Sequence, residues 1–204
     1  MHRFGLKPVV TDLKVGLLGG SFDPPHQGHV PVTEWAFRRL GLDRVWWLVA
    51  PQNPLKQLRP APLQERIATA RRVQTHPRVM ITDLETHIRS HHTINTLEYL
   101  VQRFPAVRFV WLMGADNLQG FTHWGRWQNI TDLVPIAVFL RPGHQGSSVY
   151  QPVMRKLKTA RLREDEARRL PVVSPPAWCL VTLPLSYVSS TSIRLGAHQS
   201  GKQE

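Results

Sequence analysis

The chain carries the segment Gly19-Gly20-Ser21-Phe22-Asp23-Pro24-Pro25-His26-Gln27-Gly28-His29 between an apolar run at residues 13–18 and a helical pattern at residues 30–40. This order predicts a buried strand, a tight loop and the start of a helix. Backbone N–H groups and the positive end of a helix dipole meet at such a point and bind phosphate. The two histidines add donors whose charge changes near neutral pH. We interpret the segment as a nucleotide phosphate site.

Strand and helix patterns alternate along the rest of the chain. Continuous apolar runs predict buried strands at residues 45–49, 78–82, 107–113, 135–140 and 178–183. Helical spacing of apolar residues predicts helices that include residues 63–75 and 93–104, and a last helix from residue 189. The alternation predicts an α/β fold with a doubly wound, mostly parallel sheet and helices on both faces.

The helical patterns also assign side chains to the core or to solvent. In residues 63–75 we expect Ile67 and Ala70 to face inward, and the charged residues to be solvated: Glu65, Arg66, Arg71 and Arg72. Thr93 is expected to cap the helix that follows it. Trp124 and Trp127 lie three residues apart; Trp127 suits core packing, while Trp124 lies nearer the preceding loop.

Length and composition suggest one domain spanning residues 1–204, with a short leader at 1–12 and an Arg-rich, solvated peripheral helix at 149–170. A chain of this length buries roughly 70% of its unfolded surface. No apolar run approaches the roughly 20 residues of a membrane-spanning helix. The start of the chain does not resemble a secretory signal, and the single cysteine, Cys179, forms no internal disulfide. We therefore expect a cytoplasmic protein with no membrane contact.

The chain is strongly basic, which favours anionic partners. It has 26 Lys and Arg against 14 Asp and Glu, a formal net charge of +12. Nucleic acid is one class of partner that this charge allows. Small phosphorylated substrates are another, because a basic cleft concentrates them. Charge alone does not separate these two from an ordinary Arg-rich surface.

Further polar motifs follow the predicted strands. A loop with two prolines, Pro51 to Lys56, follows the second strand, and Gly114-Ala115-Asp116 follows the fourth. Arg141 comes directly after another strand. Ser189-Ser190-Thr191-Ser192-Ile193-Arg194 opens the last helix with hydroxyls that either cap it or bind phosphate. Because ligands bind beyond the carboxyl ends of parallel strands, these motifs should converge.

Two of these motifs resemble the signatures of the nucleotidyltransferase superfamily. His26-Gln27-Gly28-His29 resembles H-x-G-H, and residues 188–194 resemble I-S-S-T-x-I-R. Within the superfamily the chain looks like the bacterial nicotinate-nucleotide adenylyltransferases, whose first motif is G-G-[ST]-F-D-P-x-H. Their [SY]-T-x-x-T-L, G-x-D and F-x-x-W motifs resemble residues 92–97, 114–116 and 121–124, while their P-x-x-P-x-x-K loop is one residue shorter here.

The resemblance implies a Rossmann-like fold and transfer of AMP from ATP to nicotinate mononucleotide, giving deamido-NAD and pyrophosphate in NAD biosynthesis. It implies Mg²⁺ carried on the ATP phosphates, no protein metal site, and no covalent intermediate on the enzyme. It implies no stable nucleic-acid partner. The sequence carries no signal for an oligomeric state.

The resemblance also implies a role for each matching residue. The catalytic residues would be His26, His29 and Arg194. The mononucleotide would contact Thr93, Thr96, Trp124 and Arg141, with Trp124 stacked on the pyridine ring. The ATP-binding residues would be Gly19, Gly20, Ser21, Phe22, Gly28, Lys56, Asp116, Ser190 and Thr191.

Several alternatives remain open at the level of sequence. One is an adenylyltransferase that prefers nicotinamide mononucleotide. Another is a different H-x-G-H enzyme, such as phosphopantetheine adenylyltransferase, which usually has Thr in place of His26, or a cytidylyltransferase, which lacks the Trp124 and Thr93–Thr96 context. A third is a basic nucleic-acid-binding module, which would leave both phosphate motifs unexplained.

Overall fold

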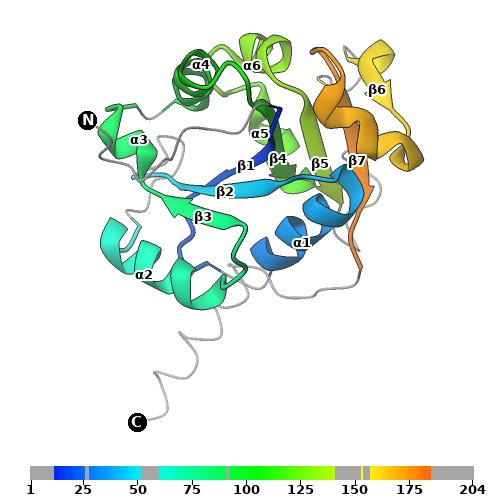
Figure 1. Ribbon diagram of the computed structural model, residues 1–204. Helices are drawn as coiled ribbons and strands as arrows, with labels where there is room; N and C mark the ends of the chain where they lie inside the picture. Colours follow the sequence, from blue (N-terminus) through cyan, green and yellow to red (C-terminus); the bar gives the residue numbers. More distant parts are fainter. Residues whose placement is uncertain are drawn as a thin grey trace.

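The computed structural model describes residues 12–25, 28–51, 60–90, 92–140, 153 and 157–184. In these residues the chain forms one sheet of seven strands in the order β3-β2-β1-β4-β5-β7-β6, with all neighbours parallel (Figure 1). The strands are β1 (Lys14–Gly20), β2 (Arg44–Val49), β3 (Val79–Thr82), β4 (Arg108–Gly114), β5 (Ile136–Leu140), β6 (Arg161–Leu162) and β7 (Trp178–Thr182).

Helices cover both faces of the sheet. On one face lie α1 (His29–Leu40) and α2 (Leu63–Val73); on the other lie α3 (Leu84–His87), α4 (Thr93–Arg103), α5 (Leu118–Phe121) and α6 (Trp127–Leu133) (Figure 1). Short 3₁₀ helices complete the described secondary structure: η1 (Ala115–Asn117), η3 (Lys158–Ala160) and η4 (Glu164–Val172). The expected doubly wound α/β fold is confirmed.

The sheet divides the buried apolar side chains into two clusters. Val15 and Leu17 of β1 face the cluster beneath α4 and α6, whereas Leu18 faces the cluster beneath α1 and α2. This division follows from the strand period of two, which sends successive side chains to opposite faces. With both faces covered, each long strand is apolar along its length, so the continuous apolar runs predicted the long strands.

The strand order reverses between β1 and β4. From β1 the sheet continues through β2 and β3 on one side, and through β4 and β5 on the other. Gly20, at the end of β1, pairs in register with Val49 of β2, and Leu18 pairs with Leu112 of β4. Such a switch point opens a crevice at the carboxyl ends of the strands, which is where doubly wound folds bind ligands.

Three local predictions were wrong. Gly19 and Gly20 belong to β1 rather than to the loop, because they pair with Leu48 and Val49 of β2. Thr93 is the first residue of α4, and His92 holds the cap position. Arg66 is buried rather than solvated, with 2% of its surface exposed.

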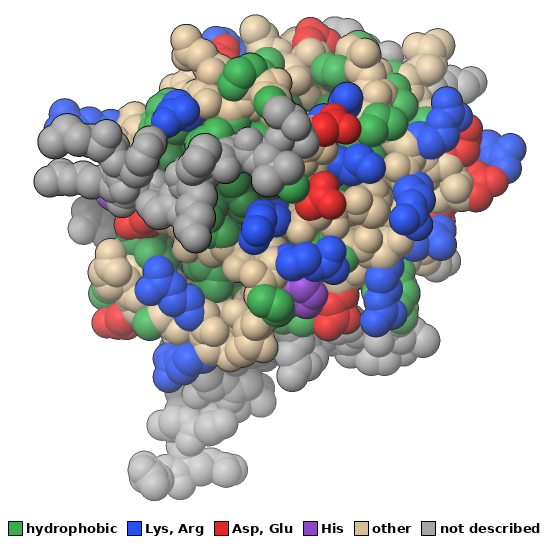
Figure 2. Space-filling view, viewed as in Figure 1, with side chains coloured by type: hydrophobic (Ala, Val, Ile, Leu, Met, Phe, Trp, Pro, Cys, Tyr) green, Lys and Arg blue, Asp and Glu red, His purple; other side chains and the backbone are tan. Residues whose placement is uncertain are grey.

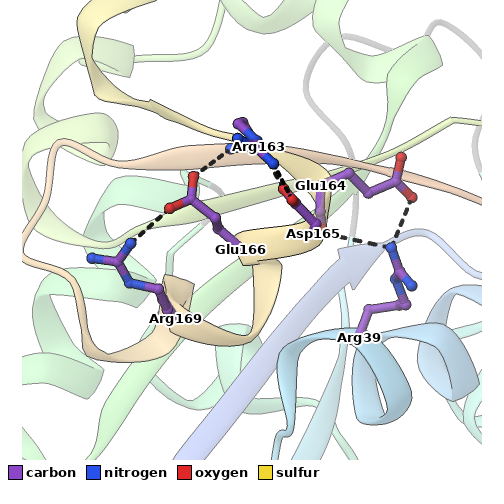
Figure 3. Close-up of polar contacts among 6 residues, drawn as sticks. All are labelled: Arg39, Arg163, Glu164, Asp165, Glu166 and Arg169. Atoms are coloured by element: carbon purple, nitrogen blue, oxygen red, sulfur yellow. Dashed lines mark hydrogen bonds and ion pairs between the residues drawn. The ribbon is translucent and has the colours of Figure 1, made fainter.

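The Arg-rich segment at residues 149–170 is not a solvated helix in its described part. Residues 161–162 form β6, which pairs with β7, and η4 places Ala167 and Leu170 in the core beside α1. Several of its charges form ion pairs with one another or with α1: Arg163 with Asp165, Arg169 with Glu166, and Glu164 with Arg39 (Figure 3).

The carboxylate of Glu164 joins this segment to the end of β7. It accepts hydrogen bonds from the backbone N–H of Thr182, at 2.9 Å, and from the Thr182 hydroxyl, at 3.0 Å. These bonds to the end of β7 explain why a charged run, which reads as a solvated helix in sequence, lies against the core here.

The ends of the chain are described only in part. Of the predicted leader, residue Asp12 lies within the described range; its backbone N–H donates to the carbonyl of Ala106 and its carboxylate pairs with Arg108. Across the described ranges, no helix combines the length and the apolar character that crossing a membrane requires.

Candidate functional site

The N-terminus of α1 lies directly after the switch point. Gly28 occupies the cap position of α1 and His29 is its first residue. Glycine supplies no capping side chain, and the first turn of α1 contains no acidic residue. The positive end of the dipole of this 12-residue helix is therefore not offset by a carboxylate of its own first turn. This is the geometry that suits a phosphate group.

Two aromatic rings hold the imidazole of His29. The ring centroid of Phe22 lies 4.6 Å from that of His29 and 4.8 Å from that of Trp47, on which it stacks. The centroids of His29 and Trp47 are 5.7 Å apart. Phe22, predicted to line the nucleotide through its backbone, also has a buried side chain and packs under the candidate catalytic group.

A hydrogen-bond chain fixes the main chain at His29. The indole N–H of Trp47 donates to the Thr33 hydroxyl at 2.9 Å, and this hydroxyl donates to the carbonyl of His29 at 3.0 Å. Thr33 is 1% exposed; its bond with Trp47 is buried and its bond with the carbonyl of His29 is partly buried. Buried hydrogen bonds of this kind hold a helix start rigidly, because breaking them leaves polar groups without partners. The first turn of α1 is thus anchored from below.

Trp111 and Trp124 occupy the opposite face of the sheet. The half-buried ring of Trp124 meets the rings of Trp111 and Phe121 edge-on, at centroid distances of 6.1 and 5.3 Å. A side chain at Gly19 would place its Cβ only 2.5 Å from the Trp111 ring, so glycine is required there. Trp111 therefore lies between two predicted site residues, Gly19 and Trp124. Sequence reasoning missed it, because its apolar strand reads as ordinary core.

Thr93 and Thr96 lie in the first turn of α4. Thr93 is partly exposed, whereas Thr96 is fully buried and donates its hydroxyl to the carboxylate of Glu85 at 3.3 Å. Burial raises the pKa of Glu85 to about 7, and the hydrogen bond from Thr96 opposes this rise. No sequence pattern identified Glu85 as a buried acid.

The loop that carries Trp124 is joined to α4 by Arg126. Its guanidinium binds both carboxylate oxygens of Glu98, at 3.0 and 2.9 Å, and the side-chain oxygen of Asn95 at 2.7 Å. Arg126 caps α6 in the left-handed region, with φ of 52°. This fork, formed by the Arg126 guanidinium with Glu98 and Asn95, holds the Trp124 loop beside the helix that begins at Thr93.

Asp116 follows β4 and is exposed at the carboxyl edge of the sheet, on the other side of the switch point from Gly20. Its carboxylate lies over Gly114, where a Cβ would come within 2.3 Å of Oδ1. The described part of the structure thus brings Gly19, Gly20, Ser21, Phe22, Gly28, His29 and Asp116 to the same edge. Six predicted site residues lie outside the described residues: His26, Lys56, Arg141, Ser190, Thr191 and Arg194.

Residues 17–196 match the cytidylyltransferase-like family, and the chain therefore belongs to it. Over 190 residues it is 53% identical to a probable nicotinate-nucleotide adenylyltransferase of Cereibacter sphaeroides strain KD131, covering 93% of this chain and 99% of the relative. Over 190 residues it is 47% identical to the protein of the same name in Ruegeria pomeroyi, covering 93% and 89%. The resemblance drawn from the motifs is confirmed.

The fold is also that of solved structures. The nicotinic acid mononucleotide adenylyltransferase of Plasmodium falciparum complexed with NaAD superposes with a TM-score of 0.67, covering 90% of this chain and 83% of that one. The two sequences are 17% identical, so this likeness shows the shared fold alone.

Proposed function

We propose that this protein is a nicotinate-nucleotide adenylyltransferase, which transfers AMP from ATP to nicotinate mononucleotide in NAD biosynthesis. The observation that carries the proposal is the start of α1, with Gly28 and His29 beside the switch point, in a chain that is 53% identical to a relative of that name. We also propose that the enzyme works in the cytoplasm.

In the reaction, a phosphate oxygen of the mononucleotide attacks the α-phosphorus of ATP. The bond from that phosphorus to the bridging oxygen breaks, deamido-NAD forms and pyrophosphate leaves. The nucleophile belongs to the substrate, so no covalent enzyme intermediate is needed. The protein contributes positioning and stabilisation of negative charge, as in other phosphoryl transfers.

The residues of the two faces receive different roles in this proposal. His29 and His26 would donate to the α-phosphate, where charge grows in the transition state. The backbone from Gly19 to Phe22, with Gly28 and Asp116, would bind ATP together with Lys56, Ser190, Thr191 and Arg194. Thr93, Trp124 and Arg141 would contact the mononucleotide. Thr96 is fully buried, so it would instead help to position the start of α4 through its hydrogen bond to Glu85.

Mg²⁺ would reach the site on the ATP phosphates. Among the described residues no group of three or more His, Cys, Asp and Glu side chains is placed to hold a metal ion. Mg²⁺ is commonly held by substrate phosphates and one or two carboxylates. Asp116 is an exposed carboxylate among the described residues of the proposed site. The ion would neutralise charge on the phosphates.

The test is a comparison of turnover with nicotinate and nicotinamide mononucleotides, each with ATP and Mg²⁺, measured as pyrophosphate release. We expect a higher kcat/KM for the acid. An equal kcat/KM for nicotinamide mononucleotide would contradict the proposed preference for the acid, and a greater one would make the amide the preferred substrate. Absence of pyrophosphate release with either substrate would refute the proposed reaction.

A further inference from the structure

Arg66 is a buried cation that the proposed reaction does not use directly. It lies in the first turn of α2 and is 2% exposed, although its neighbour Glu65 and the later arginines of the same helix, Arg71 and Arg72, are exposed. Burying a charge destabilises a fold unless the charged group is fully hydrogen-bonded. Its partners therefore define what it does.

The guanidinium of Arg66 donates to four main-chain carbonyls. Nε donates to Ala61 at 2.7 Å, and Nη2 donates to Pro51 at 3.0 Å. Nη1 donates to both Ser21, at 2.5 Å, and Ala50, at 2.8 Å. Burial lowers the pKa of Arg66, and the nearby carboxylate of Asp23 opposes this shift.

The four carbonyls belong to three segments that meet at the site. Ser21 follows β1, Ala50 and Pro51 follow β2, and Ala61 precedes α2. Gly20 and Val49 are paired in register, and the N–H of Ala50 still donates to Gly20 at 2.9 Å. The Arg66 side chain thus links the two segments just beyond the point where the backbone hydrogen bonds between β1 and β2 end.

The bond to Ser21 also fixes the next peptide group. A peptide unit is planar, so holding the carbonyl of Ser21 sets the direction of the N–H of Phe22. Phe22 has a φ of 48°, a left-handed conformation that non-glycine residues seldom adopt without support. Its ring in turn contacts His29.

We propose that Arg66 is a positioning residue for ATP, whose guanidinium holds the backbone after β1 and β2 in the conformation that binds the nucleotide. This inference rests on the proposed function. Arg66 belongs to α2, which covers one face of the sheet with α1, whereas Thr96 belongs to α4, which covers the other face together with the cluster that includes Trp124 (Figure 1). Loss of the Arg66 guanidinium should therefore weaken the binding of ATP more than the binding of the mononucleotide.

The test compares Arg66→Met, which keeps the length of the stem but removes every donor, with Arg66→Lys, which keeps the charge but not the fork. Arg71→Met is the matched control, since Arg71 is exposed on the same helix. For Arg66→Met we expect KM for ATP to rise about tenfold or more, the size expected for losing charge-assisted hydrogen bonds. KM for the mononucleotide should rise less than about threefold, Arg66→Lys should fall between, and the control should match the wild type.

An unchanged KM for ATP in a folded Arg66 variant would overturn the inference. So would an equal rise in both KM values, since a purely structural role lowers Tm without favouring one substrate. Failure of both variants to fold would likewise assign Arg66 to stability alone. If the wild type turns over neither mononucleotide, the proposed function fails; calorimetric titration of ATP into wild type and Arg66→Lys then tests the inference separately, and an equal Kd refutes it.

Discussion

His29 depends on three residues for its position. Phe22 and Trp47 hold its ring, and Thr33 holds its carbonyl at the start of α1. Rigid placement matters because a donor stabilises a transition state only if it already points to where charge will develop. A catalytic histidine on a frayed helix end would have to be ordered during the reaction.

We expect His29→Ala to lower kcat by about 10²–10³, the usual effect of removing one such donor, with smaller changes in both KM values. Steady-state kinetics with ATP and nicotinate mononucleotide measures this. The control is His87→Ala on α3, whose pair with Asp83 is partly exposed to solvent. A fall in kcat of less than tenfold in a folded His29→Ala protein would remove His29 from the catalytic role.

Glu85 gives the free energy of unfolding a predictable pH dependence. Its pKa rises from 4.5 to about 7 on folding because the carboxyl is buried. Below pH 4.5 both states are protonated and stability is not reduced; as pH rises to 7 the unfolded state loses its proton first, so stability falls. Above pH 7 the free energy of unfolding stays lower than at acidic pH by a constant amount, on the order of 3 kcal/mol.

Glu85→Gln should abolish this fall, because the amide keeps the shape and a hydrogen-bond acceptor for Thr96 without titrating. Urea unfolding at pH 5 and pH 8 measures it: the wild type should lose stability relative to the variant between the two values. The exposed Glu65→Gln is the control and should follow the wild type. Parallel curves for wild type and Glu85→Gln would show that Glu85 does not titrate in this range.

The motifs predicted that Gly28 and His29 lie at the start of a helix, because the order of strand, loop and helix can be read directly from the sequence. Arg66 was missed although a signal existed: with Leu63, Ile67 and Ala70 it completes the i, i+3, i+4, i+7 spacing of the inward face. A charge on an apolar stripe indicates a buried polar partner. Its carbonyl partners, however, come from residues up to 45 positions away, which no local pattern supplies.

At the scale of elements, α4 and the loop before α6 are joined by the fork of Arg126. Since this loop carries Trp124 and α4 begins at Thr93, the fork sets the spacing between two predicted mononucleotide contacts. The pair of Arg126 with Glu98 is about half exposed, so its effect on overall stability should be small.

Arg126→Ala should therefore raise KM for nicotinate mononucleotide several-fold, while KM for ATP and Tm change little. Kinetics with each substrate varied in turn, together with a thermal melt, tests this. Arg103→Ala is the matched control, an exposed arginine in the last turn of α4. An equal rise in both KM values would mean that the fork supports the fold in general rather than the Trp124 loop.

Strand length separates the elements that sequence predicted from those that it did not. Five strands are buried on both faces, so their continuous apolar sequences predict them: β1, β2, β4, β5 and β7. The two-residue β6 exists because it pairs with β7, and η4 exists because Ala167 and Leu170 reach the core while Glu164 binds Thr182. These causes are tertiary, and a charged segment without its partners reads as a solvated helix.

At the scale of the whole molecule, the chain carries a net charge of +12, and on the face drawn in Figure 2 the basic side chains do not gather into one patch. Figure 2 shows Lys and Arg side chains interspersed with Asp and Glu. Long-range attraction nevertheless follows net charge and raises the encounter rate with anionic substrates. Both proposed substrates carry phosphate.

We expect kcat/KM for ATP to fall as ionic strength rises from about 0.01 to 0.15 M, because the Debye length shortens from about 30 to about 8 Å. Kinetics in KCl at fixed Mg²⁺ measures the slope, while Tm controls for salt effects on folding. Parallel titration of duplex DNA should show no tight binding. An ATP kcat/KM that is independent of salt would exclude steering by the net charge.

The alternation of strands and helices was enough to predict the whole-molecule architecture, because a right-handed crossover leaves few topologies for parallel strands. It was not enough to assign the residues to two faces. That assignment depends on the pleat and the register of each strand, for which a shift of one residue would exchange the faces.

The division of the tryptophans between the two faces has an optical consequence. Of the seven in the chain, Trp47 lies against Phe22 and His29 on the face of α1 and α2, while Trp111 and Trp124 meet edge-on on the opposite face. Indole fluorescence responds to the immediate surroundings of each ring, so the proposed roles predict that ATP changes the emission of Trp47 and that the mononucleotide changes the emission of Trp124. Trp124→Phe should then remove the response to the mononucleotide and keep the response to ATP, so that stopped-flow measurements on the wild type and the variant would give the order of substrate binding.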